Sequence, residues 1–92
     1  MNVKTFGKKY PVIAVTWDGT NLEDIQEFLG KEYKVVQDGA VRLLIHHKDR
    51  TFEVLCGWYI FEEEYIDEFS NINYRLCCAS PEIMSEYYDI ID

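Results

Sequence analysis

The sequence predicts an α+β fold, in which a small antiparallel β-sheet of about five strands carries one amphipathic helix after its first strand and a short C-terminal helix. Apolar runs rich in β-branched and aromatic residues recur along the 92-residue chain, and short turns separate them. Such turns favour antiparallel pairing, and an early segment with helical spacing adds the helix. No repeat, low-complexity tract or Pro/Gly/Ser-rich linker interrupts residues 1–92, so we expect a single domain.

The first predicted strand is followed directly by the predicted helix. Residues 10–17 alternate and contain β-branched side chains, which is typical of a strand. Residues 22–29 place their apolar side chains at helical spacing. Asn21 stands at the N-cap position, and Gly30 stands at the C-terminal position that favours a left-handed backbone. The helix is therefore expected to span residues 22–29.

A hairpin and its continuation are predicted next. Asp38-Gly39 lies between two apolar runs, and this dipeptide is a strong short-range hairpin signal. A polar turn at 48–50 leads into a strand candidate at 51–56. Gly57 then indicates a bulge or a tight turn before the strand candidate at 58–61.

The C-terminal part of the chain adds one strand and one helix. Ser70-Asn71 is typical of a turn, and residues 72–78 form a further strand candidate. Ser80-Pro81 combines an N-cap residue with a proline at the first helical position. We therefore expect a short helix over 82–88.

The two halves of the chain differ in charge. Residues 1–50 hold eight Lys or Arg against seven acids, a net of +1, whereas residues 51–92 hold Arg75 against ten acids, a net of −9. A field of one sign repels like-charged surfaces and steers opposite ones. Binding a polymeric nucleic acid needs many cations, so we expect no direct nucleic-acid binding.

The apolar runs and the cysteines indicate the compartment. No apolar stretch approaches the ~20 residues of a membrane helix, and the N-terminal apolar run is too short for a signal peptide. Cys56, Cys77 and Cys78 are an odd number without the spacing of a disulfide framework, which favours reduced thiols. We therefore expect a cytoplasmic protein that does not enter a membrane.

The densest charge forms a candidate acidic docking surface between residues 62 and 68. Its acids are Glu62, Glu63, Glu64, Asp67 and Glu68. A uniform, wet environment does not split carboxylate pKa values as acid–base catalysis requires, and the calcium-loop pattern is absent. Two interpretations stay open: a solvated surface, or a face that docks on a basic partner, including a mimic of nucleic-acid phosphates. Tyr65 and Phe69, interleaved with the acids, favour docking slightly.

A second candidate surface is cationic and aromatic. Two or three donors and one aromatic plate suffice for a small nucleotide. The candidate ligand-binding residues are Trp17, Arg42, His46, Lys48, Arg50, Trp58, Tyr59 and Arg75. The alternative is that Arg42 faces solvent and that Trp17 and Trp58 anchor the core. No Gly-rich phosphate loop is present, which excludes the usual enzymatic nucleotide folds.

Two pairs of adjacent residues bear on metal binding and catalysis. Neighbouring side chains of a strand point to opposite faces, so His46 and His47 cannot readily hold one ion, and no zinc-ligand spacing occurs. The same alternation separates Cys77 from Cys78, and nothing local supplies a base for a thiol nucleophile. We therefore expect no metal, no cofactor, no catalytic residue and no enzymatic activity.

The segment PVIAVTWDGTNLEDIQEFLG resembles the start of the PGDYG family, a small uncharacterised domain common in phages and prophages. LLIH at 43–46, FEVLCGWYI at 52–60 and CASPEIM at 78–84 match the same pattern, so the resemblance covers roughly residues 10–88. The Gly-Asp-Tyr step of the family stands here as Gly57-Trp58-Tyr59, without the acid. The resemblance implies the fold and a phage origin, and it implies no catalytic residues.

These observations together predict a non-catalytic phage or prophage accessory protein with an anti-defence role. It is expected to bind and sequester a host component in the host cytoplasm, either an immune protein or a nucleotide-derived immune signal held in an oligomeric pocket. A homo-oligomer is expected. The alternatives are a structural or assembly module that only mediates oligomerisation, and an acidic nucleic-acid mimic that inhibits a host nucleic-acid-binding enzyme.

Overall fold

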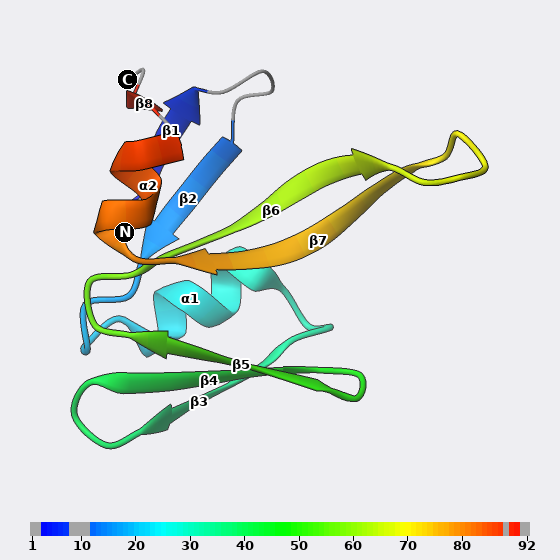
Figure 1. Cartoon of the computed structure of the whole chain (residues 1–92). Helices are drawn as coiled ribbons and strands as arrows, with labels where there is room; N and C mark the ends of the chain where they lie inside the picture. The colour runs from blue at the N-terminus through cyan, green and yellow to red at the C-terminus, as the bar shows by residue number, and fades with distance from the viewer. Residues whose placement is uncertain (1–2, 8–11, 88, 91–92) are drawn as a thin grey trace.

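Eight strands and two helices form within residues 3–7, 12–87 and 89–90, which are the residues that the computed structural model describes (Figure 1). Their order is β1 (Val3–Gly7), β2 (Val12–Thr16), α1 (Leu22–Leu29), β3 (Lys34–Asp38), β4 (Arg42–His47), β5 (Arg50–Leu55), β6 (Tyr59–Ile66), β7 (Ile72–Ala79), α2 (Pro81–Tyr87) and β8 (Asp89–Ile90). Within these residues, neither helix has the length and apolar character needed to cross a membrane.

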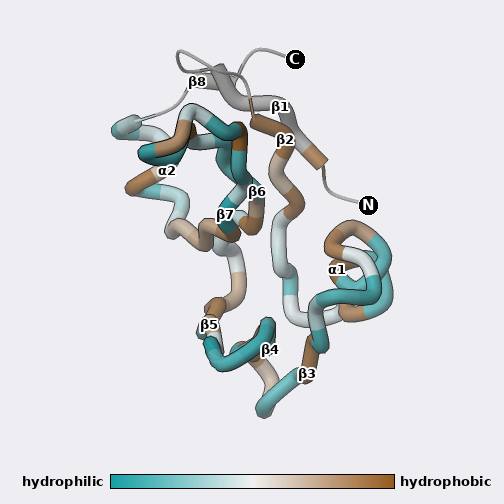
Figure 2. Tube along the Cα trace, turned by 90° about the vertical axis from the view of Figure 1, so that its right-hand side faces the viewer, coloured by the Kyte–Doolittle hydropathy of each residue, from teal (hydrophilic) through white to brown (hydrophobic). Residues whose placement is uncertain are grey.

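The strands form two separate antiparallel sheets, and the prediction of one sheet of about five strands is wrong. One sheet has the order β7-β6-β2-β1-β8, and the other has the order β3-β4-β5. The helix α1 follows the second described strand rather than the first. The fold is therefore mostly β, with two small helices. Figure 2 places the three-stranded sheet at the opposite end of the molecule from α2.

Gly57 is the point where the chain passes from one sheet to the other. Its φ is 92°, a left-handed value that favours glycine. Its N–H donates to the backbone oxygen of Trp17 at 2.7 Å, and the N–H of Trp17 donates to the backbone oxygen of Trp58 at 3.0 Å. The strand after Gly57 is thereby paired with β2 instead of β5. The sequence indicates the break at this glycine but not the change of partner.

The strands β1 and β8 were not expected from the sequence. They contain five and two residues, and the two residues of β8 are too few for an alternation. They pair with each other, with Phe6 opposite Ile90, although they lie near opposite ends of the chain. Pairing over such a distance leaves no local sequence signal.

The predicted helix after the strand at 10–17 is confirmed with its bounds. The strand is present as β2, and its first two expected residues lie outside the described ranges. The side chain of Asn21 makes no cap hydrogen bond; its amide group donates to the backbone oxygen of Thr16 at 2.8 Å instead. Gly30 has a φ of 89° and donates its N–H to the backbone oxygen of Gln26. The helix thus ends at the expected residue, but the ψ of Gly30 is −176°, which is not the expected left-handed cap, and its start is not capped by Asn21.

The other predicted turns are also present. β3 and β4 form the hairpin expected at Asp38-Gly39, with Asp38 opposite Arg42. β4 and β5 join through the expected polar turn, with His47 opposite Arg50. The expected C-terminal helix begins at Pro81, and the hydroxyl oxygen of Ser80 accepts the N–H of Ile83 at 3.4 Å. Position 88, the expected end of this helix, lies outside the described residues.

Two hydrophobic clusters lie on the two faces of β2 and β6. The first contains Val15, Trp17 and Ile60 with the buried residues of α1, β4 and β5. The second contains Val12, Ala14, Phe61, Ala79 and Met84, the last of these from α2. Successive residues of a strand face opposite ways, so neighbours in β2 and β6 belong to different clusters. These two strands therefore join both halves of the core.

Candidate functional site

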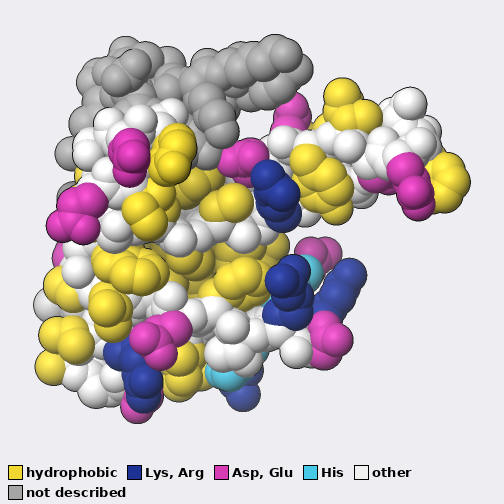
Figure 3. Space-filling view, in the orientation of Figure 1, with side chains coloured by type: hydrophobic (Ala, Val, Ile, Leu, Met, Phe, Trp, Pro, Cys, Tyr) yellow, Lys and Arg dark blue, Asp and Glu magenta, His cyan; other side chains and the backbone are white. Residues whose placement is uncertain are grey.

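The hairpin of β6 and β7 extends beyond the body of the protein as an arm, here defined as residues 62–76. β2 pairs with β6 only as far as Ala14 opposite Phe61. β6 continues to pair with β7 up to Ile66 opposite Ile72. The outer part of the hairpin thus projects away from both clusters (Figures 1 and 3). Figure 3 shows hydrophobic and acidic side chains along it.

Asp67 orders the turn at the end of the arm. Its Oδ1 accepts the N–H groups of Phe69 and Asn71, both at 2.9 Å. Its Oδ2 accepts the side-chain amide of Asn73 at 2.7 Å. The hydrogen bond from the backbone of Asn71 is the main cause that lowers the pKa of Asp67. The arm therefore ends in a defined turn.

One face of the arm carries an acid that is balanced by a cation, and we call it the balanced face: Glu63, Tyr65, Asn73 and Arg75. The guanidinium of Arg75 donates to Glu63 Oε1 at 2.9 Å. The same group lies 5.6 Å from the ring centroid of Tyr65. The hydrogen bond to Glu63 is the main cause that raises the pKa of Arg75. Arg75 is the only Lys or Arg in residues 51–92, and its positive charge is thus neutralised on this face.

The opposite face combines carboxylates with large apolar side chains, and we call it the open face: Glu62, Glu64, Ile66, Ile72 and Tyr74. Ile66, Ile72 and Tyr74 are 68%, 64% and 61% exposed. Closer to the body, the same face continues into Ile60, Leu76 and Cys78, which belong to or pack against the first cluster. The open face is therefore an exposed extension of a core surface.

Two tyrosine hydroxyls hold the carboxylates of the open face. Tyr33 donates to Glu62 Oε1 at 3.2 Å, and Tyr74 donates to Glu64 Oε1 at 3.1 Å. The pKa of Tyr33 is raised, first by desolvation and then by the charge of Glu62. The pKa of Tyr74 is raised, first by its hydrogen bond to Glu64. None of the three ion pairs formed among the described residues uses Glu62 or Glu64.

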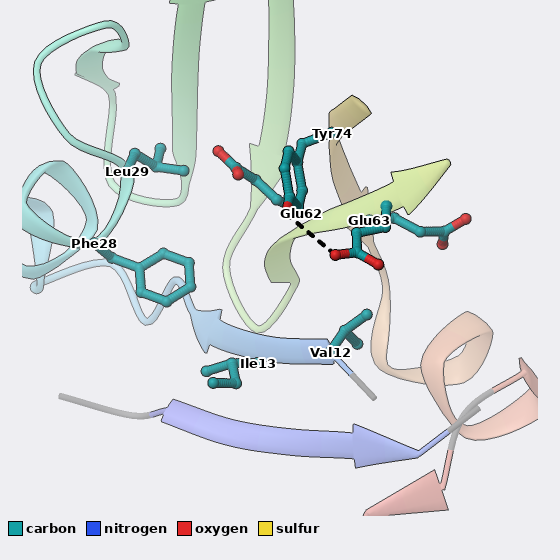
Figure 4. Close-up of a pocket in the computed structure, with 8 residues that line it drawn as sticks. Val12, Ile13, Phe28, Leu29, Glu62, Glu63 and Tyr74 are labelled. Atoms are coloured by element: carbon teal, nitrogen blue, oxygen red, sulfur yellow. Dashed lines mark hydrogen bonds between the residues drawn. The ribbon is translucent and has the colours of Figure 1, made fainter. Parts of the chain in front are cut away.

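A cleft of about 560 Å³ opens where β6 separates from β2. Figure 4 shows Val12, Ile13 and Phe28 on one side of this space and Glu62, Glu63 and Tyr74 of the arm on the other. A smaller hollow of about 300 Å³ lies further out, lined by Glu64, Tyr65, Ile66 and Ile72. Ligand pockets typically measure about 300–1,000 Å³, so the cleft has room for a short segment of a partner.

The five acids predicted as a docking surface divide into separate roles. Glu62 and Glu64 lie on the open face, and Glu63 lies on the balanced face. Asp67 holds the turn, and Glu68 is exposed beside it. The sequence analysis missed the apolar residues Ile66, Ile72 and Tyr74, because the charge of residues 62–67 dominates their pattern. The signal was the period-two alternation at 72–76, where Ile72, Tyr74 and Leu76 alternate with Asn73 and Arg75.

The residues predicted to bind a nucleotide are not brought together. Trp17 is fully buried, and its indole N–H donates to the backbone oxygen of Val41 at 3.1 Å, so it offers no free ring face. Arg42 pairs with Asp38 and with Glu53. Trp58 packs against the first cluster and Tyr59 against the second. Arg75 lies on the arm, in the five-stranded sheet, whereas β4 and β5 belong to the other sheet.

The remaining candidates of this set lie around the β4–β5 turn. His46 Nδ1 lies 3.0 Å from the hydroxyl oxygen of Thr51. Lys48 takes a positive φ of 57° in the turn. The guanidinium of Arg50 lies 5.6 Å from the ring centroid of Phe52. These contacts are local and leave no aromatic plate facing a group of donors.

The paired histidines and cysteines lie apart in the fold. The ring of His47 stacks on Tyr33, with centroids 4.4 Å apart. Cys78 packs against the first cluster and Cys77 against the second. Burial is the main cause that raises the pKa of the Cys78 thiol to about 12. Within the described part of the chain, no three His, Cys, Asp or Glu side chains are grouped to hold a metal ion.

Comparison with protein-family models, curated proteins and solved structures finds no match for this chain. The resemblance of residues 10–88 to a phage family therefore stays a prediction.

Proposed function

We propose that the protein is a non-catalytic phage or prophage accessory protein that binds and sequesters a host protein through the open face of the arm. The single observation that supports this is the difference between the two faces. Arg75 balances Glu63 on one face. On the other, carboxylates outside any ion pair formed among the described residues lie beside Ile66, Ile72 and Tyr74, which are largely exposed. Such a surface fits a partner with basic and apolar groups.

The apolar residues supply the affinity in this proposal. Fully burying an Ile side chain contributes about 1.5–3 kcal/mol, and Ile66 and Ile72 still expose about two-thirds of their surface. Burial of each by a partner is then worth about 1–2 kcal/mol. Clusters of a few such anchors carry most of the binding free energy in protein interfaces. The arm concentrates its anchors over a short length of hairpin.

The carboxylates supply steering and selectivity. Glu62 and Glu64 favour approach of a basic surface and oppose an acidic one. We favour a protein partner over a trapped nucleotide, because Trp17 is buried and Arg42 is already paired with two acids. The sequestration and anti-defence role rests on the family resemblance together with this surface.

The test is affinity capture from lysate of the bacterial host with matched variants of the protein. In the arm variant, Ile66→Thr and Ile72→Thr replace the anchors but keep β-branched residues that suit a strand. The control is Val41→Thr, which changes an exposed apolar residue outside the arm. We expect a partner that binds the wild-type protein and the control, is lost with the arm variant, and associates more slowly at high salt. Equal capture by the arm variant would contradict the proposal.

A further inference from the structure

We propose that the segment captured by the arm is an extended basic peptide that adds as a strand to the free edge of β6 within the cleft. This inference rests on the proposed function and names the chemistry of the partner. Peptides commonly bind to a sheet edge in this way, because main-chain hydrogen bonds supply affinity and alternate side chains supply specificity.

The alternation of backbone hydrogen bonds identifies the free edge. The N–H of Asp67 donates to the backbone oxygen of Asn71 at 3.0 Å, so the odd-numbered residues of β6 direct their backbone groups toward β7. The N–H of Trp17 donates to the backbone oxygen of Trp58, so the even-numbered residues direct theirs toward β2. These two hydrogen bonds lie at opposite ends of β6, and both give the same assignment of odd-numbered and even-numbered residues to the two edges.

The pairing between β2 and β6 stops before β6 reaches its end. The last paired residues are Ala14 and Phe61. Beyond them, the N–H and C=O groups of Glu64 and Ile66 face the side from which β2 has separated, and no described strand pairs with them there. Unpaired edges of this kind are templates for another strand. The outer edge of β7 also lacks a strand partner among the described residues, but β7 lines the cleft with Tyr74 alone, whereas β6 lines it with Glu62, Glu63 and Glu64.

The side chains around the cleft specify basic residues in the added strand. Ile13 and Phe28 form an apolar surface, and Glu62 and Glu64 lie across from them (Figure 4 shows the first three). A Lys or Arg side chain has an aliphatic stem that packs on apolar groups and a charged head that pairs with carboxylates. The ring of Phe28 adds a face that attracts a cation. Basic residues at every second position then match the period of a strand.

Charge argues against a second copy of the chain in this position. The protein carries a net charge of −8, and the arm of another copy brings the same carboxylates. Like charges opposite each other on paired strands are destabilising. A basic segment of another protein has the complementary charge.

The probe is a short synthetic peptide of alternating Lys and Val, with blocked ends. We expect it to bind the full-length protein, and we expect its acidic counterpart, alternating Glu and Val, not to bind. Amide hydrogen exchange read by NMR should show protection of Glu64 and Ile66 on binding. Protection of Tyr74 and Leu76 instead would place the peptide on the outer edge of β7 and would overturn the inference. An analogue N-methylated on its central residues keeps the charges but cannot donate along its edges, so its binding should be lost.

Variants of the arm test the contributions of its carboxylates and of its free edge. Glu64→Gln removes a carboxylate from the open face and should weaken binding of the Lys–Val peptide roughly two- to fivefold. Glu68→Gln is the matched control, because it removes the same charge from an exposed residue of the arm that lines neither the cleft nor the smaller hollow, and the affinity should be unchanged. Ile66→Pro removes one donor from the free edge and leaves the hydrogen bonds to β7, which odd-numbered residues make; it should weaken binding of the Lys–Val peptide.

The outcomes distinguish this inference from the proposed function. If the N-methylated peptide binds as well as the parent, strand addition is wrong, whereas docking of a basic partner on the arm stands. If no basic peptide binds but capture of a host protein still depends on Ile66 and Ile72, the inference fails and the proposed function stands. If capture is also independent of these residues, both fail. Sedimentation that shows dimers of the wild-type protein but not of Ile66→Pro would assign the edge to a second copy and would also overturn the inference.

Discussion

At the scale of single residues, the alternation along β2 decides what each side chain does. Trp17 and Val15 belong to the first cluster, and Ala14 and Val12 belong to the second. Trp17 has one further contact, because its indole N–H reaches the backbone oxygen of Val41 in the turn between β3 and β4. This residue thus ties the end of the five-stranded sheet to the three-stranded sheet. Its size and aromatic ring serve packing.

Trp17→Phe should lower the free energy of unfolding by about 2 kcal/mol. The substitution leaves a cavity in the first cluster and removes the hydrogen bond to Val41. Urea denaturation of the variant and the wild-type protein measures the difference. Capture of a partner by the arm should not change, since Trp17 is fully buried. An unchanged denaturation midpoint would contradict the structural role.

Cys78 should make the protein less stable at alkaline pH. Burial raises the pKa of its thiol from 9.0 to about 12, and the charge of Cys77 adds to the effect. Above the unfolded value the unfolded state loses a proton that the folded state keeps, so stability falls as pH rises, by at most about 1.4 kcal/mol per unit. Denaturation series from neutral pH to above pH ~9 measure this slope. The slope should be shallower in Cys78→Ala, and an equal slope in both proteins would refute the assignment.

At the scale of elements, local patterns were predictable and long-range pairings were not. The helix at 22–29, the hairpin at Asp38-Gly39 and the helix that begins after Ser80 all depend on neighbouring residues. The division into two sheets depends on what the strand after Gly57 pairs with, and β1 and β8 depend on each other across the whole chain. The arm was not predicted, because the acids at 62–68 were interpreted as a polar surface rather than as the continuation of a strand.

The candidate site was also only partly predictable from sequence, because it too depends on long-range strand pairing. The acids at 62–68 were identified as a docking surface, but their division between two faces requires knowing that the strand β6 continues through them. The apolar half of the open face comes partly from β7, which the turn at Asp67 brings opposite β6. The nucleotide hypothesis combined residues that are distant in the fold.

Asp67→Ala should loosen the end of the arm without unfolding the body. The substitution removes the acceptor of the N–H groups of Phe69 and Asn71. Amide hydrogen exchange should become faster at residues 66–72 and stay unchanged in β2 and β4. Glu68→Ala, at the exposed neighbouring position, is the control and should leave exchange unchanged.

Lowering the pH should loosen the end of the arm in the wild-type protein, as the Asp67→Ala substitution does. The pKa of Asp67 is lowered below 3.8 in the folded state, chiefly by the backbone of Asn71. Its contribution to the order of the turn is therefore present above that value and is lost as pH falls through the folded pKa. Protection factors, which correct exchange for its intrinsic pH dependence, should fall at the tip, and unchanged protection factors would contradict the role of Asp67.

At the scale of the whole molecule, net charge controls how the apolar arm behaves in solution. The protein carries −8 at neutral pH, and its pI is about 4.6. Repulsion between copies keeps the exposed Ile66 and Ile72 apart. The expected homo-oligomer stays a prediction, and the open face is acidic enough to oppose self-pairing.

Self-association should therefore increase as the pH falls from 7 toward 4.6, where the net charge vanishes. Light scattering at fixed ionic strength measures the mean mass along this series. The variant with Ile66→Thr and Ile72→Thr should associate less than the wild-type protein at the same pH, because its charge is the same but its anchors are gone. Equal association would show that another surface is responsible.

The early separation of β2 from β6 has a consequence for how this protein can diversify. Ile66, Phe69 and Ile72 take part in neither hydrophobic cluster. Their replacement therefore does not disturb the packing that holds the body together. The sequence of the hairpin can therefore change while the remainder of the chain is retained. In the laboratory, the same separation makes the body a scaffold on which hairpins of new specificity can be grafted.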